Sequence, residues 1–220
     1  AYPRRLHFVS SSPPQLRKVL SKKLRQDGLD WTSDTLKDQA YNIKRGQFKL
    51  LRKQIAYKTA ALLTLMDSPE GKNYVLVGDS AESDAYIYLG INLLLSGKLS
   101  QTSFEKYLQI AEVPETEAQA ITRAFSDHLR NKKAPWIFIR NIEGVRLQKC
   151  PPLTDPILDF EDYFEMALHS LVVGILDPHS VPTIAVAMHN QYGRSLAWLK
   201  SELLAAARHL DHPTREPLDP

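Results

Sequence analysis

The stretch YVLVGDSAESDAYIY, residues 74–88, points most directly to the fold of this 220-residue chain. It starts with a continuous run of β-branched and aliphatic residues, which is typical of a strand buried on both faces of a parallel sheet. The run stops at Gly78. A strand of this kind predicts an α/β fold, in which ligands bind beyond the carboxyl ends of the strands. We therefore expect a functional site immediately after this strand.

Two carboxylates occupy the expected position of that site. Asp79 follows a glycine that permits close approach of a ligand, and Asp84 comes within about one helical turn. Mg²⁺ keeps several waters and needs few protein ligands, so Asp79 could bind it directly and Asp84 through water. The alternative is structural: an Asp-Ser turn followed by an acid that caps a helix is common in loops.

A second junction lies in FVSSSPPQLRKVL, residues 8–20. We expect a short buried strand over Leu6–Val9 and a helix over Gln15–Gln26. A strand that turns at once into a helix directs backbone N–H groups and a positive helix end at one point, which favours an anion such as phosphate. The alternative is that Ser12 is only an N-cap and that the two prolines after it only fill the first turn.

The helix expected over Gln15–Gln26 has one apolar and one basic face. The apolar face carries Leu16, Val19, Leu20 and Leu24, and the other face carries Arg17, Lys18, Lys22, Lys23 and Arg25. Such a basic face is usually only solvated. With a second basic cluster, Lys44, Arg45, Lys49, Arg52 and Lys53, it could instead attract an anionic membrane surface.

Lys58 lies inside a predicted helix over Lys49–Met66, among apolar neighbours. The common outcome for such a lysine is that its amine extends to solvent. A buried lysine beside a carboxylate and a phosphate would instead neutralise their excess negative charge.

The remaining sequence supplies one more strand and several helices. Residues 29–47 predict a flap or an edge hairpin, residues 100–133 a helical insertion, and Pro135–Ile142 a second buried strand. From Pro156 the pattern is purely helical. We expect an α/β core over 1–150, a helical C-terminal extension over 151–210 and a disordered tail over 211–220.

The composition is that of a soluble globular protein. The formal charge of +3 is too small to support a nucleic-acid partner, and no nucleic acid is expected. Cys150 is the only cysteine, which excludes a disulfide framework and leaves the compartment undetermined. No apolar run is long enough to cross a bilayer, and no signal peptide is present in this sequence.

Two further groups could bind metal but are interpreted structurally. The sequence DFED, Asp159–Asp162, could hold a paired-carboxylate site, but a solvated helix start is the preferred interpretation. The histidines are too scattered to form a chelating pair on one helix face, so we interpret them as surface or packing residues.

Taken together, the motifs resemble those of haloacid dehalogenase superfamily phosphohydrolases. The segments FVSSSPPQL, YK, YVLVGDSAESDAYIY and IFIRNI, in this order, resemble more closely the catalytic domain of actin-patch-associated phosphatidate phosphatases and their bacterial relatives. The resemblance covers about residues 5–90 and 135–142. It implies a Rossmannoid parallel sheet and Mg²⁺-dependent hydrolysis of a phosphorylated small molecule or lipid, with phosphatidate as the suggested substrate.

The resemblance also implies roles for individual residues. Ser10 would hydrogen-bond the transferring phosphoryl group with help from the backbone N–H of Ser11, and Ser12 would remain the helix cap. Lys58 would pair with the nucleophile and the phosphate. Asp79 would bind Mg²⁺, and Asp84 would support it.

The sequence departs from the family pattern in two places. Tyr57 stands where the family has histidine, which puts that histidine's role in doubt. The motif Asp-x-Asp-x-Thr, which supplies the nucleophile and the general acid/base in the family, has no match within residues 1–220. Because Ala1 is not an initiating methionine and lies close to an apparent core strand, we expect this motif upstream.

We therefore expect a fold that is incomplete at its N-terminus and inactive as residues 1–220 alone. The alternative function is a catalytically inactive module that binds phosphate or lipid on the same fold. An interaction protein built on the late helices is the third interpretation.

Overall fold

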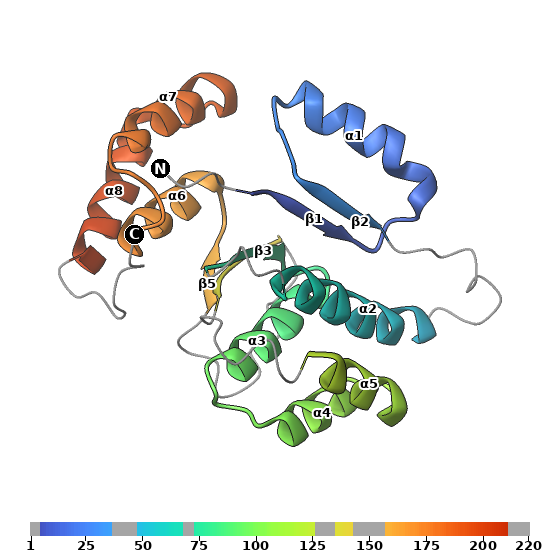
Figure 1. Ribbon diagram of the computed structural model, residues 1–220. Helices are drawn as coiled ribbons and strands as arrows, with labels where there is room; N and C mark the ends of the chain where they lie inside the picture. The colour runs from blue at the N-terminus through green and yellow to red at the C-terminus, as the bar shows by residue number, and fades with distance from the viewer. Residues whose placement is uncertain (1–4, 37–47, 68–72, 126–134, 143–156, 211–220) are drawn as a thin grey trace. The chain divides into compact units, whose positions relative to one another are not determined.

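The structure, a computed structural model, describes residues 5–36, 48–67, 73–125, 135–142 and 157–210 (Figure 1). Helices and strands share the described chain, and every strand pairing in those ranges is parallel. The predicted α/β class with Rossmann-like parallel sheets is therefore confirmed. The chain divides into two compact units: unit 1 comprises Ala1–Tyr74 and Tyr86–Ala134, and unit 2 comprises Val75–Ala85 and Pro135–Pro220.

The sheet of unit 1 consists of two short strands. Strand β1 (His7–Ser10) pairs in parallel with β2 (Ser33–Leu36). Between them lie the short 3₁₀ helix η1 (Pro14–Leu16) and helix α1 (Arg17–Gln26), which provide the crossover that a parallel pair requires. Within residues 29–47 the description covers only β2, which pairs with β1, so the predicted flap or edge hairpin stays a prediction. Residues 37–47 lie outside the description.

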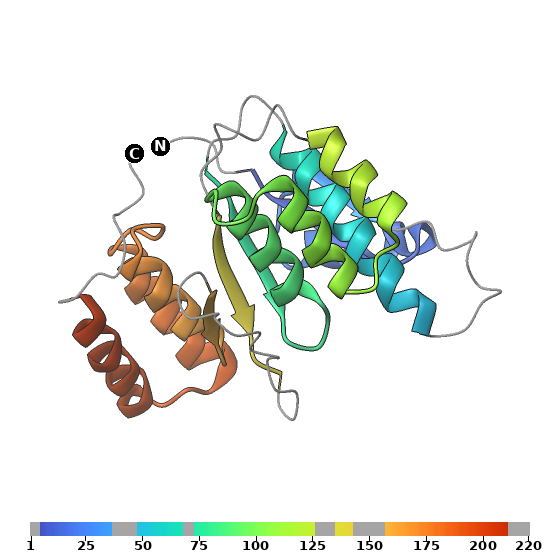
Figure 2. The same ribbon diagram turned by 90° about the horizontal axis from the view of Figure 1, so that it is seen from below.

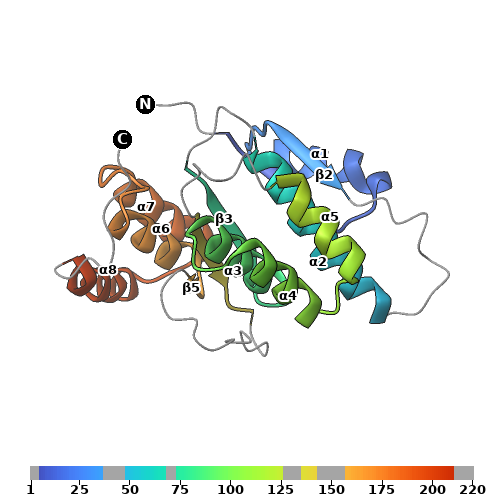
Figure 3. The same ribbon diagram turned by 60° about the horizontal axis from the view of Figure 1, so that its bottom comes forward.

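Helices build most of the core of unit 1. Helix α2 (Phe48–Met66) packs against β1 and against α5 (Glu115–Phe125), which in turn packs against α4 (Gln101–Ile110) (Figure 3). The largest buried side chains of these helices are Leu63, Met66, Phe104 and Leu108. The helical pattern predicted for residues 100–133 is confirmed for α4 and α5, and residues 126–134 lie outside the description.

Helix α3 (Asp84–Leu95) comes very close to α4 at a glycine. A Cβ atom at Gly90 would lie 2.5 Å from Cε1 of Tyr107, closer than real atoms approach. The Tyr107 ring stacks on Tyr86 with centroids 4.2 Å apart, and its hydroxyl donates to the Tyr86 carbonyl at 2.7 Å. The Tyr86 hydroxyl donates in return to the Tyr107 carbonyl. Only a residue without a side chain fits at position 90.

The sheet of unit 2 has the order β3-β4-β5, formed by β3 (Val75–Asp79), β4 (Trp136–Arg140) and β5 (Ile157–Phe160). The central strand β4 is buried from Trp136 to Ile139. On β3, Leu76 is buried, but Val75 is 40% and Val77 47% exposed. The expectation that β3 is buried on both faces is therefore wrong. Strand β3 is the edge strand, and the described residues leave one of its faces uncovered.

Strand β5 corrects a second expectation. Residues Ile157–Phe160 form a strand in register with β4, so the chain is not purely helical from Pro156. A segment of four residues, ILDF, is too short for its periodicity to separate a strand from the start of a helix. The three helices that follow, α6 (Tyr163–Val172), α7 (Ser180–Tyr192) and α8 (Leu196–Leu210), agree with the prediction.

Helices α6, α7 and α8, coloured orange to red in Figure 2, share an apolar core. It is formed by Phe164, Leu168, Val181, Met188 and Leu199. Among the described residues, no helix is both long enough and apolar enough to cross a membrane. Cys150 and the predicted tail over 211–220 lie outside the description, and the predicted domain boundaries stay a prediction.

Candidate functional site

The serines after β1 form a turn instead of a helix cap. The backbone N–H of Ser12 donates to Ser10 Oγ at 3.1 Å, and Ser10 Oγ donates to Ser12 Oγ at 3.0 Å. The N-cap of η1 is Pro13, in extended conformation and without a side-chain cap, so the predicted capping role of Ser12 is wrong. Pro13 holds the chain extended between the serines and η1, and Ser12 bonds back to Ser10.

The helix start is also displaced from the serines. Helix α1 begins at Arg17, after the 3₁₀ turn, and not directly after the strand. The 3₁₀ turn η1 leads directly into α1, so the two together match the helix predicted over Gln15–Gln26, and anion binding at this junction stays a prediction. What the junction does provide is a half-buried hydroxyl pair at the carboxyl end of β1, with Ser11 between its two members.

Lys58 is buried in α2. It is 4% exposed, so its amine is not extended into solvent as the commoner alternative would have it. Helix α2 packs against β1, the strand that ends at Ser10. Unit 1 thus contains Ser10, Ser11 and Lys58 on two elements that are in contact.

Tyr57, which replaces the histidine of the family pattern, is a half-buried neutral phenol. Burial raises its pKa, and the positive charges of Arg17 and Lys58 act in the opposite direction. With a raised pKa, Tyr57 remains protonated at neutral pH and can donate a hydrogen bond, but it cannot serve as a base there.

In unit 2, Asp79 ends β3 and organises the loop after it. Its Oδ1 accepts hydrogen bonds from the backbone N–H groups of Ala81 at 2.9 Å and Glu82 at 3.2 Å. This is the turn that the structural alternative expects. Within the described ranges, Oδ2 of Asp79 makes no hydrogen bond, so one oxygen remains open to a ligand.

Ser80 fixes the same loop to the neighbouring strand. Its backbone N–H donates to the Arg140 carbonyl at 2.9 Å, and its hydroxyl accepts from the N–H of Ile142 at 2.9 Å. Both partners belong to the carboxyl end of β4 and the residues just after it. The loop that carries Asp79 is therefore held to the sheet by two bonds.

Asp84 closes the loop as the first residue of α3 and is 8% exposed. Asp79 and Asp84 both belong to unit 2. No group of three or more histidine, cysteine, aspartate or glutamate side chains that could hold a metal occurs among the described residues. The two hard carboxylates fit Mg²⁺ only as a site completed by water or substrate oxygens, and this ion remains a prediction.

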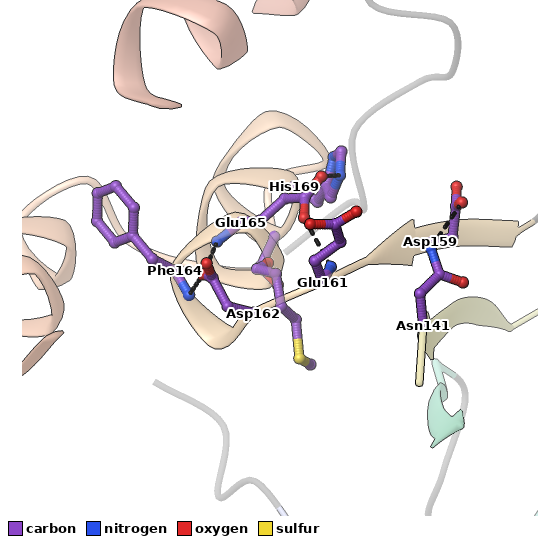
Figure 4. Close-up of polar contacts among 9 residues, drawn as sticks. Asn141, Asp159, Glu161, Asp162, Phe164, Glu165 and His169 are labelled. Atoms are coloured by element: carbon purple, nitrogen blue, oxygen red, sulfur yellow. Dashed lines mark hydrogen bonds and ion pairs between the residues drawn. The ribbon is translucent and has the colours of Figure 1, made fainter. Parts of the chain in front are cut away.

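The DFED sequence is divided between two elements: Asp159 and Phe160 end β5, and Glu161 and Asp162 lead into α6 (Figure 4). The preferred interpretation as a helix start is therefore correct only for its second half. Asp162 caps α6: its Oδ1 accepts from the backbone N–H of Phe164 at 2.8 Å and of Glu165 at 3.2 Å. The side chain of Glu165 bonds back to the chain before the helix: its Oε2 accepts a hydrogen bond from the backbone N–H of Glu161 at 2.7 Å. Asp162 thus satisfies two of the open donors of the first helical turn, and Glu165 binds the residue before the cap.

A polar cavity that the sequence analysis did not identify lies beside this helix start. It has a volume of about 410 Å³ and adjoins the carboxyl ends of β4 and β5. Five acids line it, namely Asp159, Glu161, Asp162, Glu165 and Glu202, together with Asn141, Ile157, Leu158, His169, Arg194 and Trp198. From the sequence, only the DFED acids indicated a site at this place. The lining residues of α8 could not be predicted, because they reach the cavity only through the packing of the helices.

Charges within this cavity are partly compensated. His169 holds the pKa of Glu165 below its usual range, against burial, which raises it, and the Glu161 N–H lowers it further. The Nε2 of His169 lies 3.8 Å from Glu165 Oε1, the distance of an ion pair when the imidazole is protonated. Arg194 lies 3.3 Å from Asp162 and stacks over Trp198 at 4.6 Å.

Comparison with known families identifies one match. The family model described as "Phosphatidate phosphatase APP1, catalytic domain" matches residues 2–101. The matched segment is slightly less than half of the chain and contains Ser10, Ser11, Lys58, Asp79 and Asp84. It supports a relationship of this segment to phosphatidate phosphatases. No curated protein and no solved structure matches the chain.

Proposed function

We propose that this chain carries part of the site of a Mg²⁺-dependent phosphomonoester hydrolase of the haloacid dehalogenase type. Its substrate would be phosphatidate or another lipid phosphate. The observation that carries the proposal is the family match over residues 2–101, which includes every site residue predicted from the sequence. The structural findings that support it are the buried Lys58 and the open carboxylate oxygen of Asp79.

In this proposal the serine turn and Lys58 hold the phosphoryl group. The hydroxyl of Ser10 now donates to Ser12, and it would turn to donate to a phosphoryl oxygen. The backbone N–H of Ser11 would supply a second donor. The ammonium of Lys58 would offset the charge of the phosphate, and its burial strengthens that attraction.

Asp79 and Asp84 would hold the metal ion. Mg²⁺ supplies neutralisation of the negative charge that accumulates on the phosphoryl oxygens. The Asp79 carboxylate has its Oδ2 open for this purpose while Oδ1 keeps the loop in shape. The bonds of Ser80 to the end of β4 keep that loop from moving away from the sheet.

The nucleophile belongs to the Asp-x-Asp-x-Thr motif that we expect upstream of Ala1. Its carboxylate would attack phosphorus and form an aspartyl-phosphate, while the lipid oxygen leaves and takes a proton from the second aspartate. Water would then attack phosphorus, give its proton to that aspartate and release inorganic phosphate. The aspartate pair is then restored to its starting state.

Asp79→Asn tests the metal role in the full natural chain. We expect phosphate release from phosphatidate to fall by about 100-fold, because one of two carboxylates that hold the ion is lost. We also expect the Mg²⁺ concentration for half-maximal rate to rise. The measurement is phosphate release against Mg²⁺ concentration.

The matched control is Asp27→Asn, which removes a carboxylate whose described contact is the ion pair with Lys23 at 2.6 Å. It should leave the Mg²⁺ dependence unchanged. If Asp79→Asn retains the wild-type rate and the wild-type Mg²⁺ dependence, Asp79 has no part in the site.

A second candidate function is a catalytically inactive module that binds phosphate or lipid phosphate on the same fold. The observation that favours it is the lack of an Asp-x-Asp-x-Thr motif in residues 1–220. Turnover by the full natural chain separates the two functions. The module would bind phosphatidate through Ser10 and Lys58 and release no phosphate under any Mg²⁺ concentration.

A further inference from the structure

Helix α1 carries an unusual concentration of positive charge on the surface of unit 1. Its ten residues contain five cations and no acid, in a chain whose net charge is only +3. None of its residues is buried, and Figure 1 shows the helix running beside the strands β1 and β2. Its apolar face packs only in part, because Leu20 and Leu24 are half-buried while Leu16 and Val19 are exposed.

Two of the cations are uncommitted. Arg17 pairs with Asp34, Lys23 pairs with Asp27, and Arg25 stacks over Trp31 at 5.7 Å. Lys18 and Lys22, in contrast, make no ion pair with any residue in the described part of the chain. One turn apart on the helix, they present their ammonium groups on the same side.

The same surface forms a shallow groove of about 540 Å³. It is lined only by residues of α1: Arg17, Lys18, Ser21, Lys22, Arg25 and Gln26. Positive side chains thus surround a depression that an anionic group can enter.

Exposed apolar side chains accompany these charges. Val19 is 64% and Leu16 42% exposed. The sequence pattern puts both on the apolar face of the helix, and the structure leaves Val19 exposed, one turn from Lys22 and Lys23. An exposed valine among lysines does not suit the phosphate backbone of a nucleic acid. It does suit the boundary between lipid headgroups and acyl chains, where interfacial helices place apolar side chains under a ring of basic ones.

We propose that α1 docks unit 1 on an anionic lipid bilayer, with Lys18 and Lys22 among the headgroups and Val19 at the edge of the acyl region. The choice of a bilayer as the partner rests on the proposed function, since phosphatidate is an anionic membrane lipid. Docking requires only surface charge, so any anionic headgroup serves. The surface is distinct from the serine turn and from Lys58.

The test is sedimentation of the full natural chain with vesicles of phosphatidylcholine and phosphatidate at a 4:1 ratio. Each cation near an anionic surface raises binding about fivefold, so the double variant Lys18→Gln/Lys22→Gln should bind about 25-fold more weakly. The control Lys98→Gln/Lys106→Gln makes the same charge change at two exposed positions outside α1 and should bind less than about twofold more weakly.

A second variant with its own control tests whether Val19 enters the acyl boundary. Val19→Ser should weaken vesicle binding by about fivefold, because a side chain that enters the acyl boundary is lost. Val186→Ser, on α7, removes a valine that is 58% exposed and should leave binding unchanged. Unchanged thermal melting of all four variants shows that the fold is intact.

Further arms separate the sources of binding. Phosphatidylserine vesicles should bind the wild type about as well as phosphatidate vesicles, pure phosphatidylcholine should not bind it, and inorganic phosphate at millimolar concentration should not displace it. The proposal is overturned if the Lys18→Gln/Lys22→Gln variant and the Lys98→Gln/Lys106→Gln control lose equal vesicle affinity. It is also overturned if the wild type binds only phosphatidate vesicles, or if it binds duplex DNA through Lys18 and Lys22 and does not bind vesicles.

Failure of docking and failure of the proposed function give different results. Asp79→Asn should bind vesicles as the wild type does, whatever its turnover. If the chain docks through Lys18 and Lys22 but releases no phosphate, the docking proposal holds and the proposed function fails. If the chain hydrolyses phosphatidate but binds vesicles independently of both lysines, the proposed function holds and the docking proposal fails.

Discussion

At the scale of single residues, the hydroxyl pair of Ser10 and Ser12 has the clearest functional consequence. The Ser12 hydroxyl accepts a hydrogen bond from the Ser10 hydroxyl, and the Ser12 backbone N–H donates one to Ser10 Oγ. Ser12 therefore controls where the Ser10 hydroxyl points. Ser12 is thus a positioning residue in the proposed site, although its sequence position suggested only a helix cap.

Ser10→Ala should lower kcat/KM for phosphatidate by roughly 10- to 100-fold in the full natural chain, the value of one hydrogen bond to a charged group. Ser12→Ala should lower it less, by about threefold to tenfold, and mainly through KM. Steady-state kinetics and thermal melting measure both. If both variants melt earlier and keep their kinetics, the serine turn serves stability alone.

At the scale of elements, the contact between α3 and α4 depends on Gly90. Gly90→Ala gains about 1 kcal/mol of helix propensity but forces the Tyr107 ring out of its stack, at a cost of about 1–3 kcal/mol. We expect a net loss of about 1 kcal/mol in the free energy of unfolding, measured by urea denaturation.

The effect of Gly90→Ala on the free energy of unfolding should change sign when the Tyr107 ring is removed. In a Tyr107→Ala background, the nearest remaining contact of a Cβ at position 90 is Phe104 Cε2 at 3.2 Å, which needs to shift by only a few tenths of an ångström. Gly90→Ala should then stabilise the protein by up to about 1 kcal/mol. A loss of stability that is the same in both backgrounds would show that Tyr107 does not set the requirement for glycine.

The start of α6 should make part of the stability depend on pH. The folded pKa of Glu165 lies below its ordinary value of 4.5, so its charged form favours folding. This contribution is present above the ordinary pKa and is lost as the pH falls through the lowered one.

Glu165→Gln keeps an oxygen for the Glu161 N–H but removes the charge. The variant should be less stable than the wild type at neutral pH, by about 0.5 kcal/mol for a partly exposed pair, and equal to it in strong acid. Urea denaturation across this pH range checks the prediction. A difference between the two proteins that does not change with pH would mean that the charge of Glu165 is immaterial.

The elements also show how far the sequence predicts the fold. Long periodic segments such as α2 and apolar runs such as β3 and β4 are predicted correctly, because each carries enough residues to reveal its period. The short strands β2 and β5 are missed, because four residues fit several patterns and their partners lie far along the chain.

The candidate site is only partly predictable for a related reason. Asp79 and Lys58 stand out locally, as an acid after a strand and a lysine among apolar residues. The bond between Ser10 and Ser12, the exposure of Val19 and the cavity beside Asp159 depend on packing between distant segments. No local pattern encodes them.

At the scale of the whole molecule, activity should depend on sequence outside residues 1–220. We expect these residues alone to release no phosphate from phosphatidate, because the proposed nucleophile is not among them, and the full natural chain to do so. Phosphate release by both forms, at equal Mg²⁺, makes the comparison. Turnover by residues 1–220 would require a nucleophile among their own side chains and would refute the assignment of that role upstream.

The way the chain divides into units has a practical consequence for truncation. Unit 2 takes β3 from residues 75–85 and everything else from 135–220, so no single cut releases it whole. A fragment that starts at residue 135 would keep β4 but lose its partner β3, and the backbone groups of a buried strand would face solvent. Cloning boundaries chosen from the linear order of helices would therefore yield insoluble fragments. A fusion of 75–85 to 135–220 retains all three strands if its linker is long enough, about a dozen residues or more, to return from the end of β3 to the start of the parallel strand β4.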